Sequence, residues 1–225
     1  VRAGFGHALG DEKGLVQGAL YSMDVKTGAI RAMVGGRDYD KSEFNRSTQS
    51  RRQPGSAFKP LIYTAAFDKG MNPSTQFVDS PIVFNDPSQE DGLWKPKNFD
   101  EKFLGPITMR TALVQSRNVV TVKILQDIGL DYAISYATNM GIESPMSKNL
   151  SLALGSSGVT LQEMVRAFSR ARDRAGSSIA ARMAMMAMTT SSSIKVNPRR
   201  RTLLMACVLP VRPRTSCTYS PTSTP

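Results

Sequence analysis

The 225-residue chain combines a hydrophobic content of 40% with a net charge of +11. That hydrophobic content can build a packed core and excludes a chain that is disordered on average. Residues 174–225 hold eight Lys or Arg and no Asp or Glu, so they supply +8 of the +11. The basic character therefore belongs to a C-terminal tail, which we place at residues 170–225.

The residue inventory argues against a metal centre. His7 is the single histidine, and no cluster of His, Cys and carboxylates accompanies it, so we predict no metal site and no cofactor. Both cysteines, Cys207 and Cys217, lie in the tail, and a cysteine-free body suits an oxidising compartment as well as a reducing one.

The start of the chain predicts a longer protein. No run of about 18 apolar residues occurs, and the first residues are neither a signal peptide nor an initiating methionine. We therefore expect residues 1–16 to be a leader from an upstream region.

The first predicted elements are a hairpin and a helix. Two apolar-rich, partly alternating runs between residues 18 and 35 flank a turn in which Gly28 can take the left-handed conformation. After a polar stretch, residues 56–69 show helical periodicity and end at Gly70. Pro60 is tolerable there because the first helical turn leaves its N–H groups unpaired.

A long connecting segment, residues 71–107, which we call the excursion, and four further helices follow. Residues 71–107 are rich in Pro, Asn and Asp, and we expect short strands there, such as PIVF at 81–84, bordering a cleft. Helices are predicted over 108–115, capped by Thr108, over 118–128, over 131–140, and from 161 onward behind a Thr160/Glu163 capping box. This order predicts an α+β fold with an antiparallel sheet flanked by helices.

The chemistry-bearing motif is Ser56-Ala57-Phe58-Lys59, in which a serine precedes a lysine by one helical turn. A lysine desolvated beside the serine would have a lowered pKa and accept its proton. The alternative is that Ser56 is a helix N-cap and Lys59 a solvated first-turn residue. A second match, Ser192 to Lys195, lies in no organised segment.

Several long segments agree at once with one family. They are RQPGSAFKPLIYTAAFDKG, DGLWKPKNFD, ALVQSRNVVTVKILQDIG and NLSLALGSSGVTLQEMVRAF. Together they resemble the transpeptidase domain of class A penicillin-binding proteins of the 1A type, whose motifs are S-x-x-K, S-x-N and K-T-G. The resemblance implies the penicillin-recognising serine acyltransferase fold, with residues 17–169 as the N-terminal part of the domain and its C-terminal part missing.

The resemblance also implies a function and a site. The function is D,D-transpeptidation, a serine acyl transfer that cross-links D-Ala-D-Ala stem peptides of peptidoglycan and is the target of β-lactams. Ser56 would be the nucleophile, Lys59 its base, Ser116 a proton relay to the leaving group, and Asn118 a substrate-binding residue. The expected location is the periplasmic face of the bacterial inner membrane, with membrane contact only through an upstream anchor and no nucleic-acid partner.

Two other motif matches lie in the wrong context. Ser147-Lys148-Asn149 also spells S-x-N but precedes LSLALG, and Lys26-Thr27-Gly28 spells K-T-G but sits in the turn of the first hairpin. No other K-T-G occurs in the 225 residues. In the family that motif lies downstream of S-x-N, on a strand that aligns the peptide substrate.

The tail departs most from the family. Its bunched Met, Ser, Thr and Pro and its lack of acidic residues after Asp173 indicate translation in a shifted frame or disorder, with a natural basic tail as the alternative. We therefore expect the hairpin of residues 18–35 to keep an unpaired edge and an uncovered apolar face. The alternative function is a catalytically dead, truncated or frame-shifted product that retains part of the fold.

Overall fold

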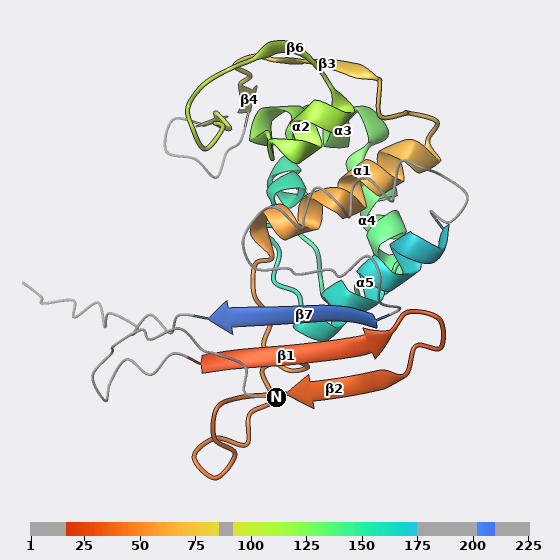
Figure 1. The fold of residues 1–225 in the computed structure, drawn as a ribbon. Coiled ribbons are helices and arrows are strands. Elements are labelled where there is room, and N and C mark those ends of the chain that lie inside the picture. The colour runs from red at the N-terminus through yellow and green to blue at the C-terminus, as the bar shows by residue number, and fades with distance from the viewer. Residues whose placement is uncertain (1–16, 86–91, 175–201, 210–225) are drawn as a thin grey trace, which may run out of the picture.

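The computed structural model describes residues 17–85, 92–174 and 202–209. A sheet lies at one end of the molecule, helix α5 (Leu161–Arg174) covers one of its faces, and the other helices lie beyond α5 (Figure 1). Strands β3 (Gln76–Asp79) and β6 (Gly105–Thr108) lie at the opposite end. The predicted α+β fold, an antiparallel sheet flanked by helices, is confirmed.

The sheet has the strand order β2-β1-β7. Strands β1 (Gln17–Asp24) and β2 (Ile30–Val34) form the predicted antiparallel hairpin, and Gly28 has a φ of 72° in its turn. Strand β7 (Thr202–Leu209) pairs antiparallel with β1 along its whole length. The expectation of an unpaired edge was therefore wrong for β1, because the apolar run TLLMACVL satisfies its backbone groups.

Strand β2 remains at the outer edge of the described sheet, and all five of its residues are exposed. Ile30, Met33 and Val34 leave 53%, 46% and 46% of their surface accessible, which agrees with the expected uncovered apolar face. Of the predicted tail, α5 extends to Arg174, and residues 175–201, with the second S-x-x-K match, lie outside the described residues. The shifted-frame interpretation of residues 170–225 stays a proposal.

Helix α1 (Lys59–Asp68) is the centre of the core. Its first eight residues, Lys59 to Ala66, are all buried, because α3 (Asn118–Ile128), α4 (Leu130–Asn139) and α5 pack around it. Each large apolar side chain buried in this way stabilises the fold by about 1.5–3 kcal/mol. The same packing takes the first residue of α1, Lys59, out of water.

The predicted helix ends are confirmed. Thr108 caps α2 (Met109–Val114) by accepting a hydrogen bond from the N–H of Thr111 at 3.2 Å, and Gly129, with a φ of 86°, separates α3 from α4. At the start of α5, Thr160 Oγ1 accepts from the N–H of Glu163 at 3.2 Å, and Glu163 Oε2 accepts from the N–H of Thr160 at 2.7 Å. This reciprocal pair is the expected capping box.

The excursion forms two small sheets. Strand β3 pairs with β6, and β4 (Phe84–Asn85) pairs with β5 (Leu93–Trp94), where the rings of Phe84 and Trp94 lie 5.7 Å apart. The prediction of a strand over 81–84 was wrong except at Phe84. Pro81 has no N–H to donate, and the side chain of Lys123 occupies the preceding Ser80 carbonyl at 3.3 Å.

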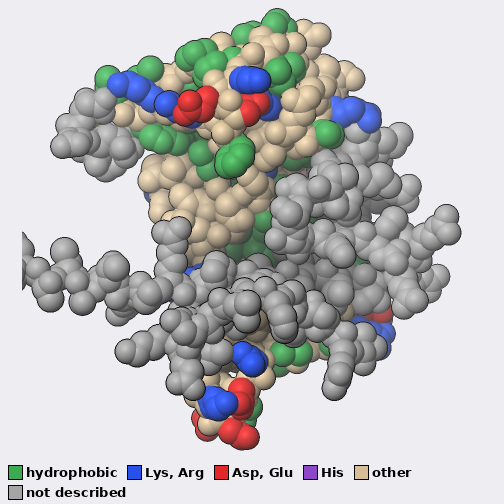
Figure 2. Space-filling model, turned by 60° about the vertical axis from the view of Figure 1, so that its left-hand side comes forward, with side chains coloured by type: hydrophobic (Ala, Val, Ile, Leu, Met, Phe, Trp, Pro, Cys, Tyr) green, Lys and Arg blue, Asp and Glu red, His purple; other side chains and the backbone are tan. Residues whose placement is uncertain are grey.

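Exposed hydrophobic side chains lie among charged ones at the end of the molecule opposite the sheet (Figure 2). In and beside the excursion the exposed set includes Val78, Phe99, Phe103, Leu104 and Val114. None of the helices in the described ranges is both long enough and apolar enough to cross a bilayer.

Candidate active site

Ser56 lies in a 3₁₀ turn, η1 (Gly55–Phe58), that leads directly into α1. It is exposed, its carbonyl accepts the N–H of Lys59, and neither its N–H nor its hydroxyl is hydrogen bonded within the described residues. Pro54, not Ser56, is the N-cap of this turn, and no side chain caps it. The N-cap alternative is therefore wrong for Ser56, whose hydroxyl and N–H are both available to a ligand.

Lys59 turns its amine into the molecule and bonds to the loop between α2 and α3. Its Nζ donates to the carbonyl oxygen of Ser116 at 2.6 Å, to Ser116 Oγ at 3.1 Å and to Asn118 Oδ1 at 2.6 Å. The residue is only 1% exposed, so the alternative of a solvated first-turn lysine is also wrong. Three predicted site residues thus meet at one nitrogen atom.

Opposing influences act on the pKa of this amine. Three oxygen acceptors match the three N–H groups of an ammonium, whereas burial, assisted by the nearby Arg117 guanidinium, lowers the pKa of Lys59 to about 7. An ordinary lysine has a pKa near 10.4 and is a poor base at neutral pH. The buried amine of Lys59 can instead accept a proton at neutral pH.

Ser116 and Asn118 belong to a tight loop between two helices. Ser116 has a φ of 54°, a left-handed conformation that is uncommon for a residue with a Cβ. Asn118 is the first residue of α3 and donates its Nδ2 to the carbonyl oxygen of Lys97 at 2.9 Å. The strain at Ser116 brings its carbonyl and hydroxyl to the same face as the Asn118 amide.

A second loop supports the turn that carries Ser56. Gly155, with a φ of 69°, ends the 3₁₀ helix η2 (Leu150–Leu154), and its carbonyl accepts the N–H of Gly55 at 3.3 Å. A Cβ built on Gly155 would lie 2.3 Å from the carbonyl oxygen of Gly55. Only glycine therefore fits where this loop backs the serine turn.

The two other motif matches, Lys26-Thr27-Gly28 and Ser147-Lys148-Asn149, are decoy motifs that make no contact with the Lys59 amine. In the hairpin turn, Asp24 Oδ1 accepts the N–H groups of Lys26 and Thr27 at 3.0 and 3.1 Å, which makes this K-T-G a structural turn. In the other motif, Lys148 is exposed and pairs with Asp131 at 3.4 Å. Neither motif joins the site.

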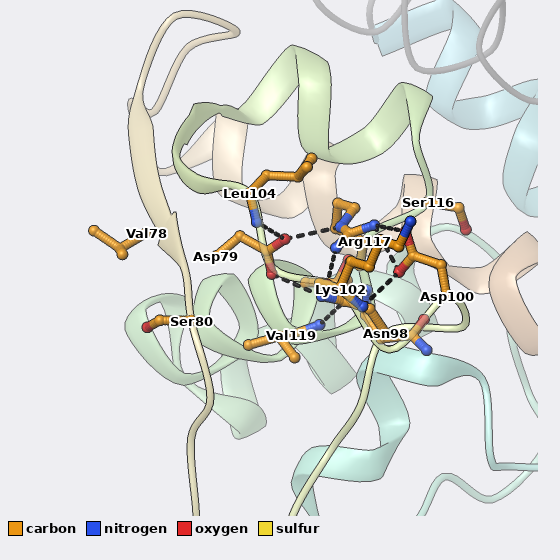
Figure 3. Close-up of polar contacts among 12 residues, drawn as sticks. Val78, Asp79, Ser80, Asn98, Asp100, Lys102, Leu104, Ser116, Arg117 and Val119 are labelled. Atoms are coloured by element: carbon orange, nitrogen blue, oxygen red, sulfur yellow. Dashed lines mark hydrogen bonds and ion pairs between the residues drawn. The ribbon is translucent and has the colours of Figure 1, made fainter.

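Sequence reasoning missed the residues that hold the Ser116 loop from behind. Arg117 is 4% exposed, and its guanidinium bonds to Asp79 and Asp100, which lie far away in sequence (Figure 3). Although burial alone would lower it, these carboxylates hold the pKa of Arg117 above its ordinary value. No spacing pattern links Asp79 in β3, Asp100 in the loop between β5 and β6, and Arg117 just before α3, so only the fold reveals this cluster.

Within the described residues, no three or more His, Cys, Asp or Glu side chains come together as a metal site would require. The groups gathered around Lys59 and Ser56 are hydroxyls, an amine, an amide and backbone N–H groups. This combination suits proton transfer and nucleophilic attack by Ser56.

Comparison with known proteins agrees with this arrangement. Residues 18–173 match the model of the penicillin binding protein transpeptidase domain. Penicillin-binding protein 1A of Pseudomonas aeruginosa is 48% identical over 154 residues, which cover 68% of this chain and 19% of that protein. Penicillin-binding protein 1A of Neisseria gonorrhoeae is 46% identical over 156 residues, which cover 69% of this chain and 20% of that protein.

The solved structures agree as well. Penicillin-binding protein 1A from Haemophilus influenzae aligns with a TM-score of 0.63 and 39% identity, covering 68% of this chain and 23% of that one. PonA1 from Mycobacterium tuberculosis, solved in complex with penicillin V, has a TM-score of 0.59, covers 70% of this chain and 44% of its own, and at 23% identity supports the fold alone.

The chain spans about a fifth of the length of the curated relatives it matches. The matched region nevertheless contains Ser56, Lys59, Ser116 and Asn118, and the predicted resemblance is confirmed. The chain belongs to the penicillin-binding protein transpeptidase family.

Proposed function

We propose that this chain carries the acylation site of a D,D-transpeptidase, with Ser56 as the nucleophile and Lys59 as its base. The observation that supports this is the buried Lys59 amine, one turn after the exposed Ser56 and hydrogen bonded to both Ser116 and Asn118. A lysine is a base only when its neutral form is accessible, and the lowered pKa provides that form at neutral pH.

The proposed reaction begins with proton transfer. Lys59 Nζ accepts the hydroxyl proton of Ser56 while Oγ attacks the carbonyl carbon of the penultimate D-Ala of a stem peptide. The resulting oxyanion accepts the N–H of Ser56, one donor of an oxyanion hole. The C–N bond then breaks, and the terminal D-Ala leaves with a proton delivered from Lys59 through the hydroxyl of Ser116.

An ester between Ser56 and the peptide remains, and the amine of a second stem peptide attacks its carbonyl carbon. The amide bond of the cross-link forms as the C–O bond to Ser56 Oγ breaks, and the proton lost by the amine passes through Lys59 to Ser56 Oγ. Asn118 holds the substrate amide in this scheme. A β-lactam would acylate the same oxygen atom by opening its ring, so β-lactams and peptidoglycan stem peptides are the proposed ligands. The proposed location is the periplasmic face of the inner membrane, which requires an upstream anchor.

A second candidate is a catalytically dead product of the same family. It is favoured by the sequence, in which the only K-T-G is the hairpin turn at Lys26-Thr27-Gly28. Losing one oxyanion donor costs about 10²–10³ in rate, so a chain without the strand that bears this motif would be acylated slowly.

Labelling with a fluorescent penicillin tests the proposal and separates the two candidates. Stable labelling of the chain that Ser56→Ala abolishes is expected for the acylation site, and Ser147→Ala, which changes the decoy motif, serves as the matched control with labelling retained. Labelling that survives Ser56→Ala contradicts the assignment of the nucleophile. A folded chain that takes no label supports the inactive product.

A further inference from the structure

The side chain of Arg117 is anchored in the excursion rather than at Lys59. Its Nε donates to Asp79 Oδ2 at 2.8 Å, its Nη1 donates to both carboxylate oxygens of Asp100 at 3.0 and 2.9 Å, and its Nη2 donates to the carbonyl of Lys102. The dashed contacts in Figure 3 converge on this guanidinium. The residue between Ser116 and Asn118 is thus tied to a segment far away in sequence.

Asn98 links the same segment to the first turn of α3. Its Oδ1 accepts the N–H groups of Asn118 and Val119 at 2.9 and 3.2 Å, and its Nδ2 donates to Asp79 Oδ1 at 2.9 Å and to the Lys102 carbonyl at 3.0 Å. Both donors and both acceptor positions of the amide are therefore used. A side chain held by four hydrogen bonds has one orientation, so Asn98 fixes where α3 begins.

Asp79 completes the cluster as a buried anion that is 1% exposed. It accepts hydrogen bonds from Arg117, Asn98 and the N–H of Leu104, the last at 3.2 Å. Removing any one partner would leave a buried charge or N–H group without its partner, which is strongly destabilising. The fully bonded cluster is therefore rigid.

The loop that this cluster holds is strained. The left-handed conformation of Ser116, with a φ of 54°, is unfavourable for a residue with a Cβ and persists only where the surroundings hold it in place. Asn98 binds the loop on its C-terminal side, and Asp79 binds it through Arg117. The loop offers its oxygen acceptors to Lys59 from Ser116 and Asn118, the two neighbours of Arg117.

We propose that Asp79 and Asn98 are positioning residues, which hold Arg117 and the start of α3 so that Ser116 and Asn118 present their oxygen atoms to Lys59. The catalytic meaning of this contact rests on the proposed function. The geometric claim does not, because the restraint can be measured without any acylation.

The test uses the full chain, isotopically labelled at its backbone nitrogens and in its lysine side chains, and has two NMR readouts. The first is hydrogen exchange at the Asn118 and Val119 amides, which are first-turn groups protected by Asn98 Oδ1. The second is the pKa of Lys59, with its resonance assigned from the spectrum of Lys59→Arg.

Asn98→Ala should accelerate exchange at both amides about tenfold or more, and should shift the pKa of Lys59 away from its wild-type value. The second effect follows because burial and Arg117, which lower this pKa, and the Ser116 and Asn118 oxygens, which favour the ammonium form, all depend on where the loop lies. A matched control is Lys123→Met, which releases the same strand at the neighbouring carbonyls of Val78 and Ser80 but leaves Asn98 intact. The control should change neither readout.

An exchanged pair provides the rescue. Asn98→Asp places a carboxylate against Asp79 and should disturb both readouts. The double variant that adds Asp79→Asn restores one N–H donor between the two positions and should return both readouts toward wild type. The proposal is overturned if Asn98→Ala leaves both readouts unchanged, if Lys123→Met disturbs them equally, or if the exchanged pair is no better than Asn98→Asp. If Asn98→Ala does not fold, this last comparison decides. Failure of penicillin labelling would contradict the proposed function and leave these readouts valid.

Discussion

Titration of the buried amine should make the stability of the chain depend on pH between about 7 and 10.5. Burial, together with Arg117, lowers the pKa of Lys59 from the ordinary 10.5 to about 7 in the folded chain. Over that window the unfolded chain carries a proton that the folded chain has released. Because the unfolded state binds more protons, the free energy of unfolding must rise with pH.

The slope for one proton is about 1.4 kcal/mol per pH unit. The contribution of Lys59 is therefore present above pH 10.5 and is lost as the pH falls through the folded value of about 7. Replacing the lysine by the unbranched, uncharged methionine should remove this contribution while keeping most of the packing. Between pH 7.5 and 9.5, the difference in unfolding free energy between wild type and Lys59→Met should change by roughly 2–3 kcal/mol, with wild type gaining.

Urea unfolding followed by the fluorescence of Trp94, the only tryptophan, measures this difference. All other ionisable groups are common to both proteins, so their contributions cancel in the comparison. Curves for wild type and Lys59→Met that rise or fall in parallel would refute the reasoning, because the lysine would then have the same pKa in the folded and unfolded chains.

Three further outcomes are expected. Lys59→Arg should keep the fold but slow penicillin acylation by orders of magnitude, because a guanidinium cannot lose its proton at accessible pH. An unchanged acylation rate would give Lys59 a purely structural role. Gly155→Ala should lower the unfolding free energy by roughly 1–3 kcal/mol more than Gly28→Ala. Both glycines have a positive φ, but only the Cβ added at position 155 would collide with the Gly55 carbonyl. Equal losses of unfolding free energy in urea titrations would contradict this. A one-base frame restoration near residue 170 should raise the acylation rate and the unfolding free energy together, and equal performance of the 225-residue chain would make the tail functional sequence.

Much of the local structure follows from signals that are themselves local. Thr108 and the Thr160/Glu163 pair mark helix starts because their side chains bond to backbone groups three residues away. Gly28 and Gly129 mark a turn and a helix end because their positive φ angles suit glycine. Such features depend on a few neighbouring residues and can be read from sequence.

The features that sequence did not reveal depend on contacts between distant segments. Lys59 has the pattern of an exposed first-turn residue, and only the packing around α1 shows that it is buried. Arg117 lies just before α3, Asp79 in β3 and Asn98 in the loop after β5, and no periodicity relates them. Pairing of β7 with β1 was also missed, because the apolar run TLLMACVL does not by itself specify its partner strand.

Locating the covalent adduct tests the central claim most directly. After reaction with penicillin, trypsin should release residues 53–69 as one peptide containing Ser56, since Lys59 precedes proline, and residues 111–117 as another containing Ser116. The account predicts that tandem mass spectrometry finds the added mass on Ser56 alone and that Ser56→Ala removes it. An adduct on Ser116, or on any serine outside residues 53–69, would contradict the account.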